Sequence, residues 1–291
     1  RMLMSITGIM NGLNSSLNSL NKVHGAQSSS VQKIATGSSH PSASYGPSDY
    51  AIIQRTYSNI GAVSQSNSNS QTANSMLSTA AGAVNETVSN LTSLRSTLLE
   101  AANGTNANSD RAALQKSVEQ TIASIDDNAS VTYNGKRLLD GTQSLTVAGE
   151  NGYNTVNLGD MTSHGLGLTD SEGKSTIDLT DASSISDALD KVDSALNAAT
   201  DQATSIGAAQ QGLTYQSSNY TTTQENLEAT ATTMDGTDIA KESVNLASSN
   251  TQEQMALFAI KQGLQSLSQQ TVGALGGINN HSRSAAASML M

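Results

Sequence analysis

The chain has 291 residues, a net charge of −10 and a pI near 4.7, and it contains no cysteine. The acidic balance argues against a nucleic-acid partner, because phosphate binding needs clustered Lys and Arg side chains. Without cysteine there is no disulfide framework and no thiolate metal site, and no apolar run approaches the roughly 20 residues that span a bilayer. Since only 3% of residues are aromatic, we expect thin helical layers built from Ala, Leu, Ile, Val and Met.

The first segment of the chain carries a heptad pattern, in which apolar residues step by four and three. The pattern passes through the polar residues His24 and Gln27, and Gly37 is a typical helix stop. Residues 38–48 contain both prolines and predict a linker. The apolar positions of this helix are Ile6, Met10, Leu13, Leu17, Leu20, Val31 and Ile34.

Two further helices are predicted before the middle of the chain. The first begins near Asp49 and ends at the Asn103–Gly104 turn, and the second is shorter and capped by Ser109 or Asp110. Apolar residues repeat at helical spacing along one face of each helix. The predicted core positions are Leu77, Val84, Leu91, Leu94, Leu98, Leu114, Val118, Ile122 and Ile125.

The middle of the chain, residues 131–178, changes to short alternating segments separated by turn dipeptides. Asn134–Gly135, Asp140–Gly141 and Asn151–Gly152 are typical of tight turns between strands. We therefore predict a small β region of two or three hairpins.

The fourth predicted helix has the most regular pattern in the sequence. It is capped by Asp181 or Ser183 and keeps one heptad register for about seven heptads, which favours a left-handed supercoil against partner helices. Polar exceptions stand at Gln210, Ser217 and Gln224. The core positions include Ile185, Leu189, Val192, Leu196, Ile206, Leu213, Leu227 and Met234.

The last helix follows a break at residues 234–238 and is apolar nearly all round in its middle. A helix of this kind is buried on several sides. We expect it to end at Gly276–Gly277, with a loose tail from Asn279. Its apolar positions include Leu246, Leu257, Phe258, Ile260, Leu264 and Leu267.

These elements predict a mainly α fold: a long antiparallel coiled-coil rod with a small β-hairpin region in the middle. The two terminal helices are candidates to pair, and neither has enough apolar surface to be stable alone. In a polymer, many copies could bury these apolar faces together. The expected parts are 1–40, a terminal helix; 41–130, rod helices; 131–180, β hairpins; 181–235, a rod helix; and 236–291, a terminal helix and tail.

Several stretches resemble the bacterial flagellins. Residues 103–110 are similar to the turn between the N-terminal rod helices of that family, and 67–90 to its long rod helix. Residues 132–141, which read TYNGKRLLDG, resemble its helix-to-hairpin signature. Residues 35–37 stand where the family has a helix stop, and 235–240 resemble its acidic joint.

The resemblance implies both a fold and a function. Terminal helices form the inner tube of a flagellar filament (a D0-like layer), and the rod helices with the hairpins form its wall (a D1-like layer). The subunit would be exported unfolded through the flagellar type III apparatus with its chaperone, and would polymerise outside the cell for motility. Filament cap and junction proteins would be further partners, and no cofactor is expected. The apolar positions of the first and last helices would form the assembly interface.

Some residues depart from the family pattern. His40, Tyr45, Pro47 and Tyr50 replace much of the usual segment after the first helix. The Pro47–Ser48–Asp49 run resembles instead the hook–filament junction protein, which is the alternative within this class.

Many flagellins engage a vertebrate innate immune receptor through an Arg, a Leu and a Glu of the rod helices. The matching positions here are Ser93, Thr97 and Ser117. Because loss of interfacial charged groups costs about a few kcal/mol, the resemblance implies weak or absent receptor activation.

Sequence motifs for catalysis are missing. A zinc-protease helix needs a His-Glu-x-x-His motif, whereas His24, His40, His164 and His281 share no metal spacing. The neighbouring acids Asp126–Asp127 point apart and are more typical of a solvated surface than of catalysis. We expect no enzyme activity; the alternative from another class is a secreted adhesin or hydrolase.

Overall fold

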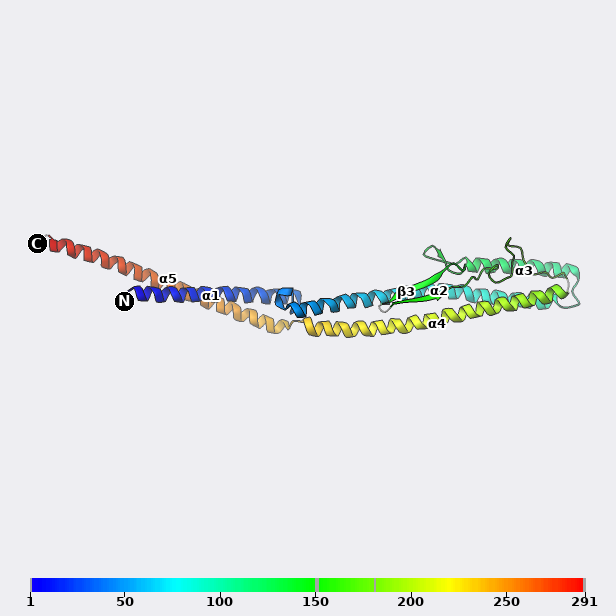
Figure 1. Cartoon of the computed structure of the whole chain (residues 1–291), viewed down its shortest axis with the longest axis horizontal. Coiled ribbons are helices and arrows are strands. Elements are labelled where there is room, and N and C mark those ends of the chain that lie inside the picture. Colours follow the sequence, from blue (N-terminus) through cyan, green and yellow to red (C-terminus); the bar gives the residue numbers. More distant parts are fainter. Residues whose placement is uncertain (1, 150–151, 181, 290–291) are drawn as a thin grey trace. The chain divides into compact units, whose positions relative to one another are not determined.

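The computed structural model describes the backbone of residues 2–149, 152–180 and 182–289, and the side chains of 7–149, 152, 154–180 and 183–273. Long helices dominate this part of the chain (Figure 1), and the predicted mainly α fold class is confirmed. The helices are α1 (Met2–Thr36), α2 (Pro47–Ala101), α3 (Asn108–Ala129), α4 (Ala182–Asp235) and α5 (Ile239–Met289), with a short 3-10 turn, η1 (Ala43–Tyr45). The strands are β1 (Thr132–Tyr133), β2 (Lys136–Arg137), β3 (Ser144–Gly149) and β4 (Gly152–Asn157).

The chain divides into two compact units. Unit 1 contains Arg1–Thr56 and Ala229–Met291, and therefore both terminal helices. Unit 2 contains Tyr57–Glu228, and therefore most of α2 and α4, all of α3 and the strands.

In unit 2, α2 and α4 run antiparallel. Arg95 Nε donates to Asp193 Oδ1 at 2.6 Å, and Gln210 Nε2 donates to Ser78 Oγ at 2.9 Å. The partner number on α4 rises as the number on α2 falls, which fixes the antiparallel direction. The two ribbons lie alongside each other in Figure 1.

The core of unit 2 is a continuous cluster of aliphatic side chains from α2, α3, α4 and the region between α3 and α4. Fully buried Leu and Ile side chains fill it, and the predicted heptad positions of α2 and α4 face inward. Burial contributes about 1.5–3 kcal/mol for each such side chain, so aliphatic residues supply most of the stabilisation of unit 2. Its largest members include Leu77, Leu91, Leu94, Leu98, Ile125, Leu138, Leu139, Leu168, Ile177, Leu179 and Ile185.

The β region consists, in the described residues, of two antiparallel strand pairs, β1–β2 and β3–β4. The β1–β2 turn has Asn134 at φ 51° and Gly135 at φ 77°, the two consecutive positive φ angles that a type I′ hairpin turn requires. The Asn-Gly dipeptide predicted this turn correctly. The β3–β4 turn includes Asn151, which lies outside the described residues.

In unit 1, α1 and α5 pack against each other as an antiparallel pair. His24 lies opposite Glu253, and Lys33 opposite Glu242. The less exposed positions of α1 step by four and three along one face: Ile9, Leu13, Ser16, Leu20, Val23, Gln27, Ser30 and Ile34. The matching face of α5 consists of Glu242, Leu246, Ser249, Glu253, Ala256, Ile260, Gly263 and Leu267.

Three predicted boundaries are wrong. Helix α5 does not end at Gly276–Gly277 but continues to Met289, because a glycine inside a helix costs only about 1 kcal/mol and no proline follows. Helix α3 begins at Asn108, so neither Ser109 nor Asp110 is its N-cap; the Asp110 carboxylate accepts the Ala107 N–H at 3.1 Å instead. Helix α4 begins at Ala182, which places Ser183 inside the helix, and residue 181 lies outside the described residues.

Candidate assembly surface on the terminal helices

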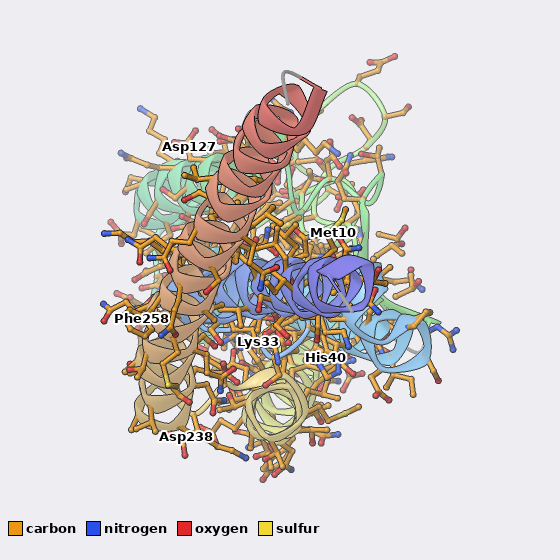
Figure 2. All side chains as sticks on the ribbon, turned by 90° about the vertical axis from the view of Figure 1, so that its left-hand side faces the viewer. Met10, Lys33, His40, Asp127, Asp238 and Phe258 are labelled. Atoms are coloured by element: carbon orange, nitrogen blue, oxygen red, sulfur yellow. The ribbon has the colours of Figure 1, made fainter. Side chains whose placement is uncertain are left out.

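Helix α1 leaves an apolar stripe uncovered. Met10 is 52% exposed, Leu17 42% and Val31 50%. Their spacing in multiples of seven places them on one line of the helix, next to the line that faces α5. Figure 2 looks toward the free end of α1 and labels Met10 on its outer surface.

Helix α5 exposes still more apolar surface. Phe258, the one phenylalanine of the chain, is 67% exposed, and Met255 beside it is 60% exposed. Figure 2 places Phe258 on the side of α5 away from α1. Leu257 and Leu264 form a neighbouring line and are about half exposed.

The predicted assembly residues therefore divide into two groups. Leu13, Leu20, Ile34, Leu246, Ile260 and Leu267 are half-buried on the paired faces of α1 and α5. Met10, Leu17, Val31, Leu257, Phe258 and Leu264 remain exposed. The side chain of Ile6 lies outside the described residues.

Polar contacts connect α1 and α5 in the half of the pair that contains Gln27 and Ser30. The Gln27 amide donates to Asn250 Oδ1 at 2.8 Å and to Glu253 Oε2 at 2.7 Å. Ser30, which is buried, donates to Glu242 Oε2 at 2.8 Å. These bonds satisfy polar groups within the seam, where an unpaired one would be destabilising.

The chain segments that link the long helices are joined by backbone hydrogen bonds. Ser39 N donates to Asp235 O at 2.5 Å, and Thr237 N donates to Gly37 O at 3.1 Å. We call residues 37–46 with 235–238 the joint; it lies within unit 1. The sequence predicted a break at both places but not that they pair.

The predicted rod-core residues fall mostly inside unit 2. Leu114, Leu189, Leu196 and Leu227 are half-buried, and Met234 is half-buried but belongs to unit 1. The buried ones are Leu77, Val84, Leu91, Leu94, Leu98, Val118, Ile122, Ile125, Ile185, Val192, Ile206 and Leu213.

Asp126 has a structural role that the sequence did not indicate. Its carboxylate accepts the backbone N–H of Ser163 at 2.7 Å and the Ser163 hydroxyl at 2.8 Å. It therefore anchors the segment after β4 to α3. Asp126 is exposed, as the sequence predicts for a surface acid, but sequence spacing gives no signal for these hydrogen bonds, because the partner lies 37 residues away.

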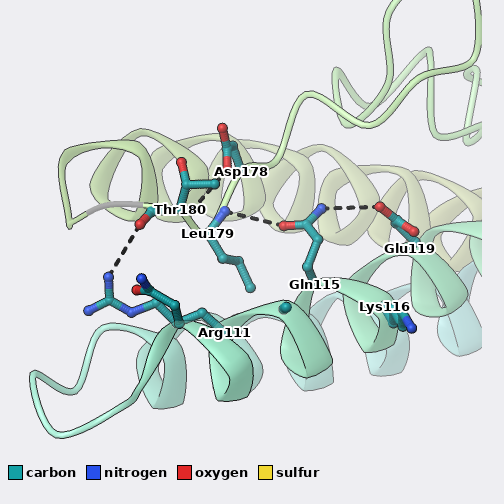
Figure 3. A pocket seen from close by; sticks show the side chains of 9 residues that line it. Arg111, Gln115, Lys116, Glu119, Asp178, Leu179 and Thr180 are labelled. Atoms are coloured by element: carbon teal, nitrogen blue, oxygen red, sulfur yellow. Dashed lines mark hydrogen bonds between the residues drawn. The ribbon is translucent and has the colours of Figure 1, made fainter.

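A cavity of about 530 Å³ lies between α3 and the segment before α4 (Figure 3). Gln115 crosses it, donating to Ile177 O at 3.0 Å and accepting the Leu179 N–H at 3.2 Å. Arg111 donates to Thr180 O at 3.4 Å. These polar groups connect α3 to the segment before α4, and they do not form a nucleophile–base pair.

Arg95 and Asp140 of unit 2 have shifted pKa values. The hydrogen bond to Asp193 raises the pKa of Arg95. A hydrogen bond from the Thr142 hydroxyl at 2.6 Å, aided by the Thr142 N–H at 3.1 Å, lowers the pKa of Asp140. Both shifts favour the charged form of the side chain, and both are typical of structural ion pairs and turns.

The positions predicted to match the receptor-binding residues of flagellins, Ser93, Thr97 and Ser117, lie on the helices of unit 2. Ser93 and Ser117 are exposed, and Thr97 is half-buried. The Thr97 hydroxyl donates to the Ser93 carbonyl at 3.1 Å. The side chains of Ser93, Thr97 and Ser117 are all uncharged.

Within the described residues, no three His, Asp or Glu side chains gather closely enough to hold a metal ion. None of the described helices is both long and apolar enough to cross a membrane.

Two family models match the chain. The bacterial flagellin N-terminal helical region matches residues 10–144, and the bacterial flagellin C-terminal helical region matches residues 189–275. A flagellin of Halalkalibacterium halodurans is 28% identical over 238 residues, covering 81% of this chain and 87% of the relative. A Bacillus subtilis flagellin is 26% identical over 284 residues, covering 86% of this chain and 93% of the relative.

A solved structure shares the fold. It is a Vibrio parahaemolyticus protein assigned to the flagellar hook-associated class, with a TM-score of 0.56, 16% identity, and coverage of 65% of this chain and 99% of that one. Together the matches define the class, a structural protein of the bacterial flagellum. The chain belongs to the bacterial flagellin family, and it is a structural subunit of the flagellar filament.

Proposed function

We propose that this subunit polymerises through the exposed apolar stripes of α1 and α5, which become the inner layer of the filament. The observation that carries the proposal is the exposure of Phe258, Met255 and Met10, each above one half. Exposed apolar patches of this kind mark association sites in soluble proteins. In a helical polymer the neighbouring copies would cover them.

The energetics favour assembly over an isolated terminal pair. Each large apolar side chain contributes about 1.5–3 kcal/mol on full burial. The stripe residues of α1 and α5 together would offset the entropy of ordering two long helices. The half-buried residues Leu13 and Ile260 support the same interface indirectly, because they hold the α1–α5 pair together.

The roles of the parts of the chain follow from polymerisation through α1 and α5. Residues 1–40 and 236–291 form the assembly layer, and the parts between them form the wall. We propose no enzyme activity, export through the flagellar apparatus with a chaperone, an extracellular location, and contacts with cap and junction proteins. Support comes from the family membership.

The second candidate within the class is the hook–filament junction role. The Pro47–Ser48–Asp49 run and the fold shared with a hook-associated protein favour it. Copy number separates the two roles: a filament subunit is present in thousands of copies per flagellum, and a junction protein forms about one ring.

The test is sedimentation of the full-length chain with serine substitutions on the stripes. Phe258→Ser with Leu17→Ser should raise the concentration needed for polymer formation by about a hundredfold, since losing two apolar contacts removes about 3 kcal/mol or more per subunit contact. The matched control is Tyr215→Ser, because Tyr215 is 73% exposed but lies in unit 2. Equal loss of assembly in both variants would contradict the proposal.

We also propose that the chain activates the flagellin receptor weakly or not at all. Ser93, Thr97 and Ser117 offer hydroxyls where the family has charged and apolar anchors. A cell reporter assay is the test, and strong activation at nanomolar protein would contradict it.

A further inference from the structure

His40 occupies an unusual place in the joint. Its side chain is 19% exposed and lies between two acids, Asp49 at the start of α2 and Asp235 at the end of α4. Gly46 permits this packing: a Cβ added there would lie 3.1 Å from the imidazole ring. The ring is therefore held from three sides, all within unit 1.

Each ring nitrogen faces a different carboxylate. Nε2 lies 3.7 Å from Asp49 Oδ2, and Nδ1 lies 4.0 Å from Asp235 Oδ1. Nδ1 is buried and has no hydrogen-bond partner. A neutral imidazole carries one N–H, so one carboxylate must then face a lone pair, whereas the protonated ring presents an N–H to both.

The two acids differ in how strongly they bind the ring. The Asp235 side chain is 12% exposed and also accepts the Ser38 hydroxyl at 2.5 Å and the His40 N–H at 3.3 Å. The Asp49 side chain is 62% exposed, so solvent screens its attraction. The buried acid is therefore the main partner.

The other charged groups near the joint are already engaged. Lys33 of α1 pairs with Glu242 of α5 at 3.9 Å and lies 5.9 Å from the centre of the Tyr45 ring. Asp238 accepts the Lys241 N–H at 3.0 Å at the start of α5. The His40 ring belongs to one linking segment and faces Asp235 at the other.

We propose that His40 is a pH-dependent positioning residue, whose protonated ring holds residues 37–46 against the Asp235 end of α4. The joint is tighter when the imidazole is protonated and looser when it is neutral. Protonation should tighten the joint, because the cationic ring has an N–H for each of the two carboxylates, whereas the neutral ring has an N–H for at most one.

Hydrogen exchange of the full-length chain, measured by mass spectrometry, tests the proposed role of His40. The measurement can be made on the purified protein whether it is monomeric or polymeric. Peptides that cover Ser39 and Thr237 report the backbone bonds of the joint. After correction for intrinsic exchange, their protection should fall about fivefold between pH 5.5 and 7.5, as expected for a partly buried charge pair. The variant His40→Gln should lose this dependence on pH.

The matched control is His24→Gln. His24 also lies near a carboxylate, Glu253 at 3.7 Å, but its side chain is 55% exposed, so this variant should keep the full pH dependence at the joint. Asp49→Asn leaves the ring in place and should reduce the dependence by less than half. Protection that is independent of pH in the unmodified chain, or a pH dependence that survives in His40→Gln, would overturn the proposal.

Discussion

Unit 1 and unit 2 are built from similar heptad helices but differ in how many of their apolar side chains are buried. Among the described side chains, nearly all the buried apolar ones belong to unit 2, and unit 1 contributes Val23, Ile53 and Ala231. Unit 1 instead holds most of the exposed ones, with Phe258 and Val244 both above 65%. A heptad pattern predicts which residues lie on one helix face, but not whether the covering partner is in the same chain.

The physical difference lies in the number of layers. Helices α2 and α4 are covered by α3 and the region between α3 and α4, so apolar residues on both of their sides find partners. Helices α1 and α5 have mainly each other, and a helix pair can cover one line of residues on each member. The second apolar line of α1, Met10, Leu17 and Val31, therefore stays exposed.

The largest effect should come from the core of unit 2. Leu94→Ala should lower the free energy of unfolding of unit 2 by about 2–5 kcal/mol, because it removes a fully buried side chain and leaves a cavity. Thermal unfolding followed by circular dichroism measures this. Leu99→Ala on the same helix is the matched control, since Leu99 is 50% exposed and its loss should change stability by less than about 0.5 kcal/mol.

A smaller effect should follow from removing the Asp126 anchor. Asp126→Ala should destabilise unit 2 by about 1–2 kcal/mol, because the Ser163 N–H and hydroxyl lose their acceptor. Urea unfolding gives the difference. The neighbouring variant Asp127→Ala should leave stability nearly unchanged, and equal effects at both positions would refute the anchor.

Unit 1 should respond locally rather than globally. Gln27→Ala should weaken the α1–α5 pair by about 1 kcal/mol, since the amide bonds both Asn250 and Glu253. Hydrogen exchange should report faster exchange in residues 20–34 and 242–256 and no change in unit 2. Gln254→Ala, an exposed position beside Glu253, is the control that should have no effect.

The smallest predicted effect concerns pH and the β region. Because hydrogen bonds from Thr142 lower the pKa of Asp140, the carboxylate stabilises the folded turn above the ordinary aspartate pKa near 3.9. That stabilisation is lost as pH falls through the lower folded value. Asp140→Asn should flatten the stability profile below about pH 4, as measured by thermal unfolding, and an unchanged profile would contradict the assignment.

The sequence predicted α4 better than α1, and the reason is physical. In α4 the predicted residues Ile185, Val192, Ile206 and Leu213 are all buried, at spacings of seven or fourteen residues. In α1 apolar residues occupy two adjacent lines, and the line that meets α5 includes Ser16 and Ser30 rather than Met10 and Leu17. Small polar residues on a paired face cannot be recognised without knowing that Glu242 accepts the hydrogen bond of Ser30.

The contact between the two segments of the joint could not be predicted from sequence patterns either. Pro41, Pro47 and Gly236 predicted breaks in the helices, and those breaks are present. The contact between His40 and Asp235 joins residues 195 positions apart, and no local pattern encodes such a distance. The same holds for Asp126 and Ser163 in unit 2.

The central claim is that the terminal helices assemble the filament while unit 2 folds on its own core. Electron microscopy of the purified full-length chain beside a truncation that lacks residues 1–40 and 240–291 tests it most directly. We expect filaments from the full-length chain and soluble monomers from the truncation. Filaments from the truncation, or monomers from both chains even when seeded with filament fragments, would contradict it.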